Sequence, residues 1–197
     1  MIEYLEHLDQ QLLLFLNSLH APWMDQPMFW ISKIKIFIPL FIVWIYQLFQ
    51  LLKVKAFAFF LMGVALLILL TDQSATITKK TVERYRPTHH LEVGPQVHTV
   101  NDYRGGTFGF YSGHAANTFG IAMLLFLTFR KRRTWIKYTF FPFAILASYS
   151  RVYLGVHYPS DIFIGMLTGI FYGFLIFQIL SLYLYKFFGI QLKQTGD

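Results

Sequence analysis

The sequence contains no cysteine and few charged residues. Disulfides and thiolate metal sites are therefore excluded, and cysteine usage says nothing about the redox state of the compartment. Charged residues make up 14% of the 197 residues, whereas 55% are hydrophobic. The balance is basic, with 17 Lys and Arg against 10 Asp and Glu. A chain this apolar, whose few charges gather between long apolar runs, is typical of an integral membrane protein.

The N-terminus lacks the basic stretch of a cleavable signal peptide, because it begins with Met-Ile-Glu-Tyr-Leu-Glu. Residues 4–19 instead place leucines and a phenylalanine at helical spacing, with acidic and amide side chains between them. This pattern predicts an amphipathic helix on the membrane surface rather than a span. Pro22 and Pro27 then interrupt the helical pattern, and Trp23 and Trp30 suit the headgroup belt.

Several apolar runs that follow are long enough to cross a bilayer, which takes roughly 20 residues. The predicted spans are residues 29–51, 56–77, 113–129, 135–148 and 160–185. The fold class is therefore all-α: an integral membrane helical bundle of about five transmembrane helices plus the N-terminal amphipathic interfacial helix. One membrane-embedded domain, 1–197, would comprise residues 1–27 as interfacial helix and lead-in, 28–186 as transmembrane core and 187–197 as a cytoplasmic tail.

The distribution of charge predicts how the chain lies across the membrane. Five spans put segments 53–55, 130–137 and 186–197 on one side, and these hold nine basic residues and one acid, Asp197. The other side holds eight basic and nine acidic residues. The positive-inside rule places the first side in the cytoplasm, so the polar connection at 78–112 faces outward. The Arg-Lys-Arg-Arg run at 130–133 is thus a topology signal rather than a nucleic-acid site.

Residues 150–161 carry three chemical groups between two apolar runs. Arg151 offers a planar fork of donors suited to phosphate oxygens, and His157 can act as a nucleophile or base. Pro159 predicts the start of a helix, with Asp161 in its first turn. A carboxylate there would reach the His157 ring and fix its tautomer. Taken alone, a membrane-interface loop with incidental polar residues would also explain this segment.

Small residues continue on the same face of the last predicted span. Asp161, Gly165, Gly169 and Gly173 recur every four residues. Glycines at this spacing let a neighbouring helix approach closely. The same face points Asp161 into the bundle rather than at lipid.

Two further clusters are expected at the outward end of the bundle. Lys79 and Arg86, the latter followed by proline, can converge above it, although isolated cations there would be interpreted as snorkelling or headgroup-binding residues. Ser112 is a good N-cap residue, and the free N–H groups that follow it, starting with that of Gly113, form an anion site. His114 lies in the first turn of this helix.

Together these clusters have the composition of a phosphoryl-transfer site. Three cations compensate the charge of a phosphate and of its transition state. Two histidines supply the two roles that displacement at phosphorus needs, attack and protonation of the leaving oxygen. The sequence has no carboxylate cluster of the kind that holds Mg²⁺ or two metals, so the cations would take the place of the metal.

The three motifs, Lys79-x6-Arg86-Pro87, Ser112-Gly113-His114 and Ser150-Arg151-x5-His157-x3-Asp161, resemble those of the type 2 phosphatidic acid phosphatase family. Its superfamily also includes glucose-6-phosphatase and the vanadium-dependent haloperoxidases. Each motif is weak alone, whereas the ordered set is specific, and the resemblance covers about residues 55–185. One departure is Tyr111, where the family usually has proline.

The resemblance implies a role for each matched residue. His157 would be the nucleophile and form a phosphohistidine, Asp161 would orient it, and His114 would protonate the leaving oxygen and later help to activate water. The phosphoryl oxygens would be bound by Lys79, Arg86 and Arg151, with Ser112 and the Gly113 amide completing the cradle. The family is metal-independent, which implies no metal and no other cofactor.

These expectations define a lipid phosphate phosphatase of the bacterial inner membrane, with its site facing the periplasm or cell exterior. Lipid would enter sideways from the bilayer, and no nucleic-acid partner is expected. By resemblance to small bacterial members, undecaprenyl diphosphate and lipid A are the leading substrates, with phosphatidylglycerophosphate and phosphatidic acid as the alternative. A vanadate-binding haloperoxidase and a non-catalytic transporter or scaffold are more remote alternatives.

Two polar groups outside the motifs also give rise to expectations. Asp72 is seven residues before Lys79, so the two share a helical face and a structural pairing is predicted. Arg84 and Arg104 lie in the outer connection with three histidines, His89, His90 and His98, and a solvated loop is expected there.

Overall fold

The computed structural model describes residues 2–132 and 134–192, most of which are helical. The helices are α1 (Ile2–Ser18), α2 (Pro22–Ser32), α3 (Ile38–Val82), α4 (Gly113–Phe129), α5 (Phe140–Tyr153) and α6 (Pro159–Phe188), with 3-10 turns at Lys35–Phe37, Pro87–His89, Gly94–Gln96 and Trp135–Tyr138. Within these ranges the only β pairing is an isolated antiparallel bridge between Tyr85 and Phe108. The predicted all-α class is confirmed.

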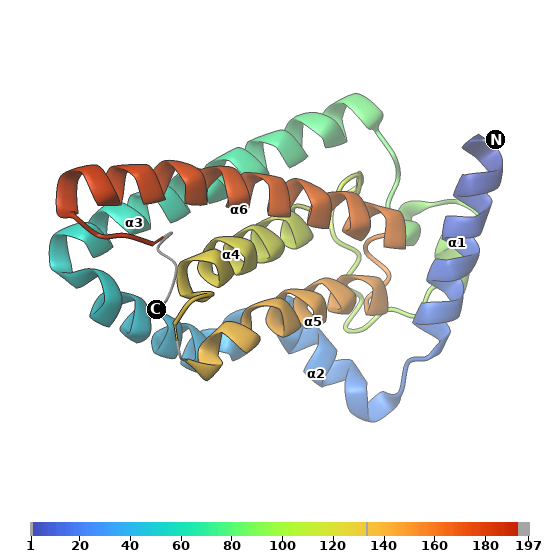
Figure 1. Ribbon diagram of the computed structural model, residues 1–197. Helices are drawn as coiled ribbons and strands as arrows, with labels where there is room; N and C mark the ends of the chain where they lie inside the picture. Colours follow the sequence, from blue (N-terminus) through green and yellow to red (C-terminus); the bar gives the residue numbers. More distant parts are fainter. Residues whose placement is uncertain (1, 133, 193–197) are drawn as a thin grey trace.

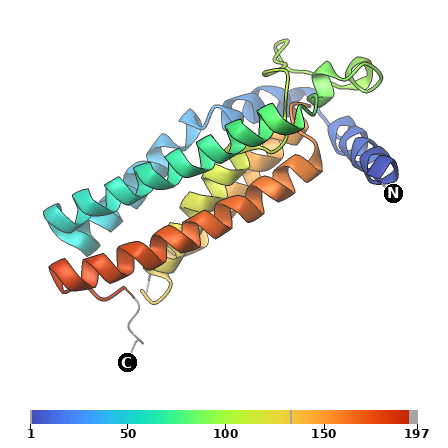
Figure 2. The same ribbon diagram turned by 90° about the horizontal axis from the view of Figure 1, so that it is seen from above.

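Helix α4 forms the centre of a bundle in which it contacts α3, α5 and α6 (Figure 1). Helix α1 lies apart from this bundle and crosses one of its ends, next to the connection between α3 and α4 (Figures 1 and 2). The C-terminal end of α6 lies at the opposite end (Figure 1). One end of the molecule is therefore formed by α1 and the connection between α3 and α4. The opposite end is formed by the bend in α3 and the C-terminal end of α6.

Helix α3 is two helices joined at a sharp bend. Lys53 has φ 59° and ψ 177°, far from helical values, and separates residues 38–52 from 54–82. These halves correspond to the first two predicted spans, but the predicted start at residue 29 is wrong. Residues 29–32 belong to α2, because Pro22 occupies a position where proline favours a helix start instead of breaking one.

Helix α5 continues five residues beyond its predicted end and carries Ser150 and Arg151 in its last turn. The prediction ended this span at 148 because the sequence turns polar there. The Ser150 hydroxyl donates to the Ala147 carbonyl at 2.7 Å, so the helix satisfies this polar group internally. By contrast, α6 begins at Pro159 as predicted, and it runs to Phe188.

Helices α4 and α6 pack at unusually short range through the predicted glycine face. A Cβ added at Gly165, Gly169 or Gly173 would lie 2.5, 2.2 and 2.4 Å from the backbone oxygens of Ser112, Ala116 and Gly120. Such distances are shorter than any real contact, so only glycine permits this approach. The contact holds the N-terminal ends of α4 and α6 together, where two of the motifs lie.

The surface of the bundle is apolar along its length. Two helical segments of the described chain, Lys35–Val82 and Pro159–Phe188, are long and apolar enough to cross a membrane, and the first contains the bend at Lys53. Many of their exposed side chains are hydrophobic, and include Ile42, Met62, Leu69, Phe163 and Phe171. Residues of this type exposed in such numbers fit contact with lipid rather than water.

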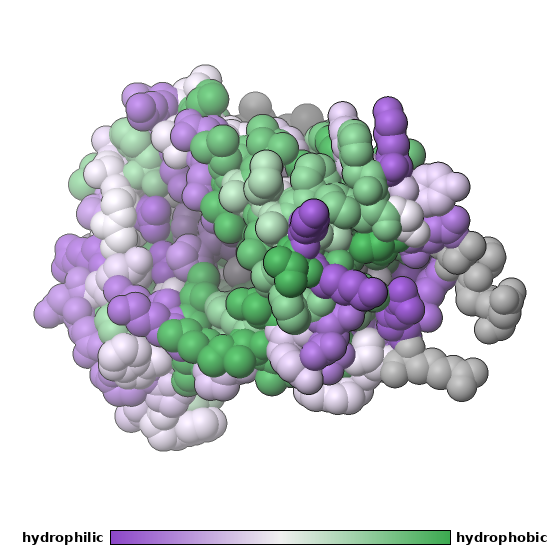
Figure 3. Space-filling model, turned by 90° about the vertical axis from the view of Figure 1, so that its left-hand side faces the viewer, coloured by the Kyte–Doolittle hydropathy of each residue, from purple (hydrophilic) through white to green (hydrophobic). Residues whose placement is uncertain are grey.

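The end of the bundle opposite α1 has hydrophobic residues across its centre and hydrophilic residues around them (Figure 3). Lys53, Lys55 and the basic residues 130–132 are exposed. Residue 133 and residues 193–197, which also entered the charge count and the predicted tail, lie outside the described residues.

Candidate active site

The three motifs meet at the end of the bundle that α1 crosses. The last turn of α3 and the connection after it supply Lys79 and Arg86, the start of α4 supplies Ser112 to His114, and the turn between α5 and α6 supplies His157. The Ser112 backbone N–H donates to the Asp161 carbonyl at 3.0 Å. This bond ties the second motif to the third.

The turn between α5 and α6 aims His157 into the protein. Gly155 has φ 66°, and an added Cβ would lie 2.1 Å from Val97 Cγ1, so this turn requires glycine. The Val156 N–H returns to the Arg151 carbonyl at 3.0 Å and closes the turn. His157 follows directly and is 2% exposed.

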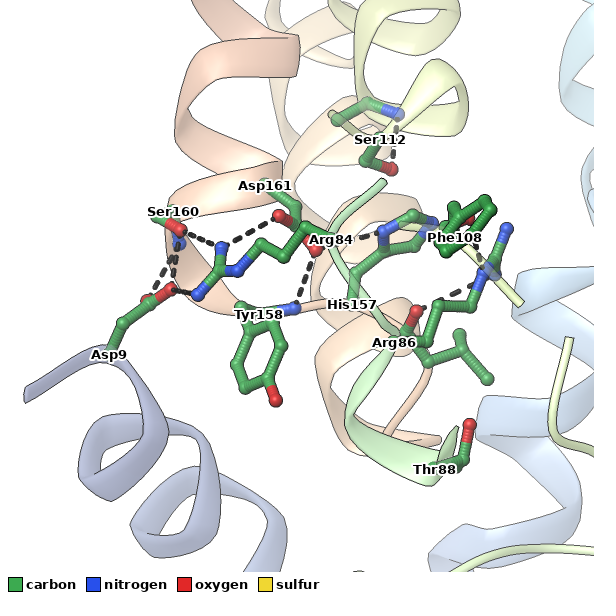
Figure 4. Close-up of polar contacts among 12 residues, drawn as sticks. Asp9, Arg84, Arg86, Thr88, Phe108, Ser112, His157, Tyr158, Ser160 and Asp161 are labelled. Atoms are coloured by element: carbon green, nitrogen blue, oxygen red, sulfur yellow. Dashed lines mark hydrogen bonds and ion pairs between the residues drawn. The ribbon is translucent and has the colours of Figure 1, made fainter. Parts of the chain in front are cut away.

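His157 and Asp161 form a buried dyad (Figure 4). The Asp161 Oδ2 atom accepts from His157 Nδ1 at 3.3 Å and from the Tyr158 backbone N–H at 3.0 Å. Because a carboxylate only accepts, the proton of the neutral ring sits on Nδ1 and leaves a lone pair on Nε2. Burial lowers the pKa of His157 to about 3, and Arg86 and Arg151 act in the same direction, although Asp161 opposes them. The ring is therefore neutral at physiological pH, as a nucleophile must be.

Arg86 is aimed at the dyad by a short antiparallel pairing of loop backbone. The Arg86 N–H donates to the Thr107 carbonyl and the Gly109 N–H to the Arg84 carbonyl, both at 2.9 Å. Extended backbone alternates its side chains, so Arg84 and Arg86 share one face while Tyr85 points away. A Cβ at Gly109 would lie 3.2 Å from Asp161 Oδ2, so the loop passes directly over the dyad.

Arg151 is 5% exposed and held from two sides. One terminal nitrogen donates to the Ser32 hydroxyl, and the other donates to the Tyr103 hydroxyl at 3.1 Å. Its buried Nε has no hydrogen-bond partner among the described residues. Buried donors are rarely left unpaired, so this atom is available to an anionic ligand.

The start of α4 supplies the remaining groups of the candidate site. The Ser112 hydroxyl caps the helix by accepting from the Ala115 N–H at 3.3 Å, which leaves the Gly113 and His114 amides in the first turn without helical acceptors. A Cβ at Gly113 would lie 3.8 Å from Lys79 Nζ, so the lysine ammonium lies beside this helix start. His114 Nε2 lies 3.1 Å from the Ser32 carbonyl, which can only accept, so this nitrogen carries a proton.

Two polar side chains beside the motifs form hydrogen bonds to neighbouring segments. Asp72 accepts from Asn117 Nδ2 at 2.8 Å, between α3 and α4, and it is one of the charges that act on Lys79. Tyr111, which replaces the usual proline, is buried and donates to the Ser74 hydroxyl at 2.7 Å. Both contacts join α3 to α4 beside the motifs.

The expectation that Arg84 is solvated is wrong. Its guanidinium donates to Asp161 Oδ1 at 3.0 Å and to Asp9 Oδ2 at 2.7 Å (Figure 4). Sequence reasoning also missed Ser32, Tyr103 and Asp9, because they come from segments far from the motifs. For Arg84 a signal existed, since it lies two residues before Arg86 and so on the same face of an extended strand.

One further group of ligand atoms lies near the site. His20, Asp25 and His98 place theirs within 4.8 Å of one another. The two imidazole rings stack 3.6 Å apart at 5°, so their in-plane lone pairs cannot meet at one cation. Asp25 is occupied by His98 Nε2 at 3.0 Å and by the Tyr153 hydroxyl at 2.7 Å. This cluster fastens the link between α1 and α2 to the outer connection.

Comparison with known proteins identifies the family of the chain. The family model of the PAP2 superfamily matches residues 56–183, which contain all three motifs. The chain is 38% identical over 181 residues to a lipid A 4'-phosphatase of Bacteroides thetaiotaomicron, covering 91% of this chain and 80% of the relative. It is 33% identical over 186 residues to the lipid A 4'-phosphatase of Porphyromonas gingivalis, covering 93% and 76%.

Solved structures show the same fold. The PAP2-type phosphatidylglycerolphosphate phosphatase of Bacillus subtilis superposes with a TM-score of 0.66 at 21% identity, covering 93% of this chain and 88% of that one. LpxE of Aquifex aeolicus superposes with a TM-score of 0.62 at 26% identity, covering 85% and 93%. The family match spans well over half of the chain and contains the dyad, the cations and the helix start described above. The chain belongs to the PAP2 superfamily and is a phosphatase embedded in a membrane.

Proposed function

We propose that this phosphatase removes a phosphate from lipid A or a closely similar lipid, through a phosphohistidine on His157. The observation that carries the proposal is the buried His157, whose Nδ1 lies 3.3 Å from Asp161 Oδ2 at the end of the bundle where the three cations meet. The two lipid A 4'-phosphatases are similar over more than nine-tenths of this chain, which favours lipid A over other lipids.

In the first step the lone pair of His157 Nε2 attacks phosphorus, and the bond from phosphorus to the ester oxygen breaks. His114 gives its proton to the departing oxygen, and Asp161 stabilises the positive charge that forms on the His157 ring. In the second step water attacks the phosphohistidine while His114 takes a proton from it. The phosphorus–nitrogen bond then breaks, inorganic phosphate leaves and His157 is restored.

The phosphoryl oxygens would be held by Lys79, Arg86 and Arg151, together with the Gly113 amide and Ser112. Two observations support this cradle. The Nε atom of Arg151 is a buried donor with no partner among the described residues, and the helix start of α4 offers free amides beside Lys79. Cations fixed in a buried site stabilise the charge that develops in the transition state.

A lipid substrate is supported by an apolar groove of about 370 Å³ between the two halves of α3 and helix α4. It reaches Asn117 and Thr118, one turn below His114. Its walls include Phe41, Trp44, Leu48, Val64, Ile121 and Phe143. An acyl chain lying in this groove would bring its headgroup to the motifs.

We place the enzyme in the bacterial inner membrane with the site toward the periplasm or cell exterior, as one membrane-embedded domain over 1–197. The charge asymmetry supports this orientation, since the exposed Lys53, Lys55 and residues 130–132 lie away from the motif-bearing end.

Undecaprenyl diphosphate is the second candidate. An undecaprenyl-diphosphatase of Sulfolobus acidocaldarius is 40% identical, but over 95 residues, 48% of this chain and 40% of that protein. Phosphatidylglycerophosphate and phosphatidic acid rank lower, because the similarity to the Bacillus subtilis enzyme is at the level of fold.

The test is phosphate release by the detergent-purified protein from equal amounts of these four lipids. Lipid A phosphorylated only at position 1 or only at position 4' resolves which group is removed. We expect the highest kcat/KM on 4'-phosphorylated lipid A. Faster release from undecaprenyl diphosphate would move the assignment to the second candidate, and release from none would contradict the proposal.

A further inference from the structure

Helix α1 contacts the elements around the catalytic turn with one face, which carries Asp9, Leu13 and Asn17. Leu13 is fully buried in a cluster with Val93, Val152 and Tyr158. Four residues on, Asn17 donates to the Tyr153 carbonyl at 2.8 Å and accepts from the His98 N–H at 2.7 Å. The apolar residues Leu5, Leu8, Leu12, Phe15 and Leu19 are exposed, which fits a helix that lies on the membrane surface.

Asp9 lies on the same inward face, four residues before Leu13, and begins a chain of charges into the active site (Figure 4). Its Oδ2 accepts from Arg84 Nη2 at 2.7 Å, and its Oδ1 accepts from the Ser160 N–H at 3.0 Å. Arg84 Nη1 donates to Asp161 Oδ1 at 3.0 Å and to the Ser160 hydroxyl at 2.7 Å. The guanidinium also lies over the Tyr158 ring, 4.1 Å from its centre.

These contacts fix the plane of the Asp161 carboxylate. One oxygen serves His157 and the Tyr158 N–H, and the other is held by Arg84. Asp161 is 0% exposed, so without Arg84 no solvent would replace the lost donor or compensate the charge. The carboxylate could then rotate away from Nδ1, and the imidazole would lose its fixed tautomer.

Resting on the function proposed above, we propose that Arg84 and Asp9 are positioning residues of this enzyme. Through the chain Asp9–Arg84–Asp161–His157, helix α1 holds the catalytic dyad in its reactive geometry. Neither residue belongs to the three motifs. A purely structural role would differ, because Arg84 would then only fasten α1 to the bundle and the dyad would keep its geometry without it.

The first test is Arg84→Met, with Arg104→Met as the matched control, since Arg104 is an exposed cation of the same connection. We expect kcat to fall about 10- to 100-fold, as misplaced catalytic groups do, while KM stays within about twofold. The acid limb of kcat/KM moves to higher pH, because a cation beside the dyad is lost while Arg86 and Arg151 remain. Arg84→Lys restores part of kcat, and Arg104→Met changes neither constant.

The second test is Asp9→Asn, with the exposed Glu3→Gln as control. The loss of kcat is smaller than in Arg84→Met, and the acid limb does not move to higher pH, because an anion is lost instead of a cation. Unfolding temperatures of all variants are measured in the same detergent. An Arg84→Met protein that is folded and keeps the wild-type kcat and pH profile overturns the proposal, and so does a rise confined to KM.

A readout that does not depend on the substrate separates this proposal from the proposed function. The ¹⁵N NMR signals of labelled histidine give the tautomer of His157, which we expect to be Nδ1–H in the wild type and mixed in Arg84→Met. If the wild type hydrolysed none of the lipids, the proposed function would fail, and the tautomer of His157 would still test the positioning role of Arg84. An unchanged tautomer in Arg84→Met contradicts that positioning role.

Discussion

At the scale of single residues, His157 combines two properties that depend on different neighbours. Its Nδ1 proton is fixed by Asp161, and its neutrality is fixed by burial and by Arg86 and Arg151. The first property sets where the lone pair points, and the second keeps that lone pair available. Each can be tested separately.

Substituting Asp161→Asn tests the orientation of the ring. Arg84 holds the oxygen in place of Oδ1, so the amide NH₂ faces His157 Nδ1 and the Tyr158 N–H, both of which now meet a donor. His157 then carries its proton on Nε2 and cannot attack. We expect kcat to fall about 10²- to 10⁴-fold with KM little changed. A kcat within threefold of wild type would contradict the assigned role.

The pH dependence of kcat/KM tests the neutrality of the ring. Because the pKa of His157 is lowered to about 3, the nucleophile stays neutral as pH falls from 7.5 to 5, and its protonation causes no loss in this range. The acid limb therefore lies below pH 5. An acid limb near 6.5, the ordinary value for histidine, would contradict a buried neutral nucleophile.

At the scale of elements, the close packing of α4 against α6 aligns the second motif with the third. Gly169 is at the centre of this contact, where an added Cβ would lie 2.2 Å from the Ala116 carbonyl oxygen. Backbone atoms cannot move aside as a flexible side chain can. The two helices would have to separate, and the bond from Ser112 to Asp161 would weaken.

We therefore expect Gly169→Ala to destabilise the protein by about 1–3 kcal/mol, the usual cost of overpacking. Thermal unfolding in detergent measures this, with Gly106→Ala as control, because nothing lies within 4 Å of a Cβ added there. An unfolding temperature equal to that of wild type in Gly169→Ala would show that the helices do not approach this closely.

The same scale shows how far the sequence predicts the structure. The glycine face and the helix start at Pro159 are local patterns with a fixed period, and both are confirmed. The extra helix α2 was not predicted, because prolines can begin a helix as well as end one. Ser32 could not be placed, because its partner Arg151 lies 119 residues away along the chain. The roles of the motif residues stay predictions until they are substituted.

At the scale of the whole molecule, the family and the membrane-embedded helical fold predicted from the sequence are confirmed. The two ends of the bundle differ in chemistry. One carries the motifs beneath α1, and the other carries exposed cations such as Lys53. This polarity predicts which end faces the cytoplasm.

The absence of cysteine makes this orientation directly measurable. Single cysteines replace Gly106, in the outer connection, and Arg132, at the other end, both of which are exposed. In intact spheroplasts we expect a membrane-impermeant maleimide to label the cysteine at 106 and not that at 132. After permeabilisation both should react, which serves as control. The reverse pattern in intact spheroplasts would contradict the proposed orientation.

The central claim is that fixed cations and histidines, without a metal, hydrolyse a lipid phosphate. Its most direct test is inorganic phosphate release from lipid A by the purified wild-type protein and by His157→Ala, each with and without a metal chelator. We expect wild-type release at the same rate in both conditions and no release above background from His157→Ala. Release that the chelator abolishes, or release that survives in His157→Ala, would contradict the account.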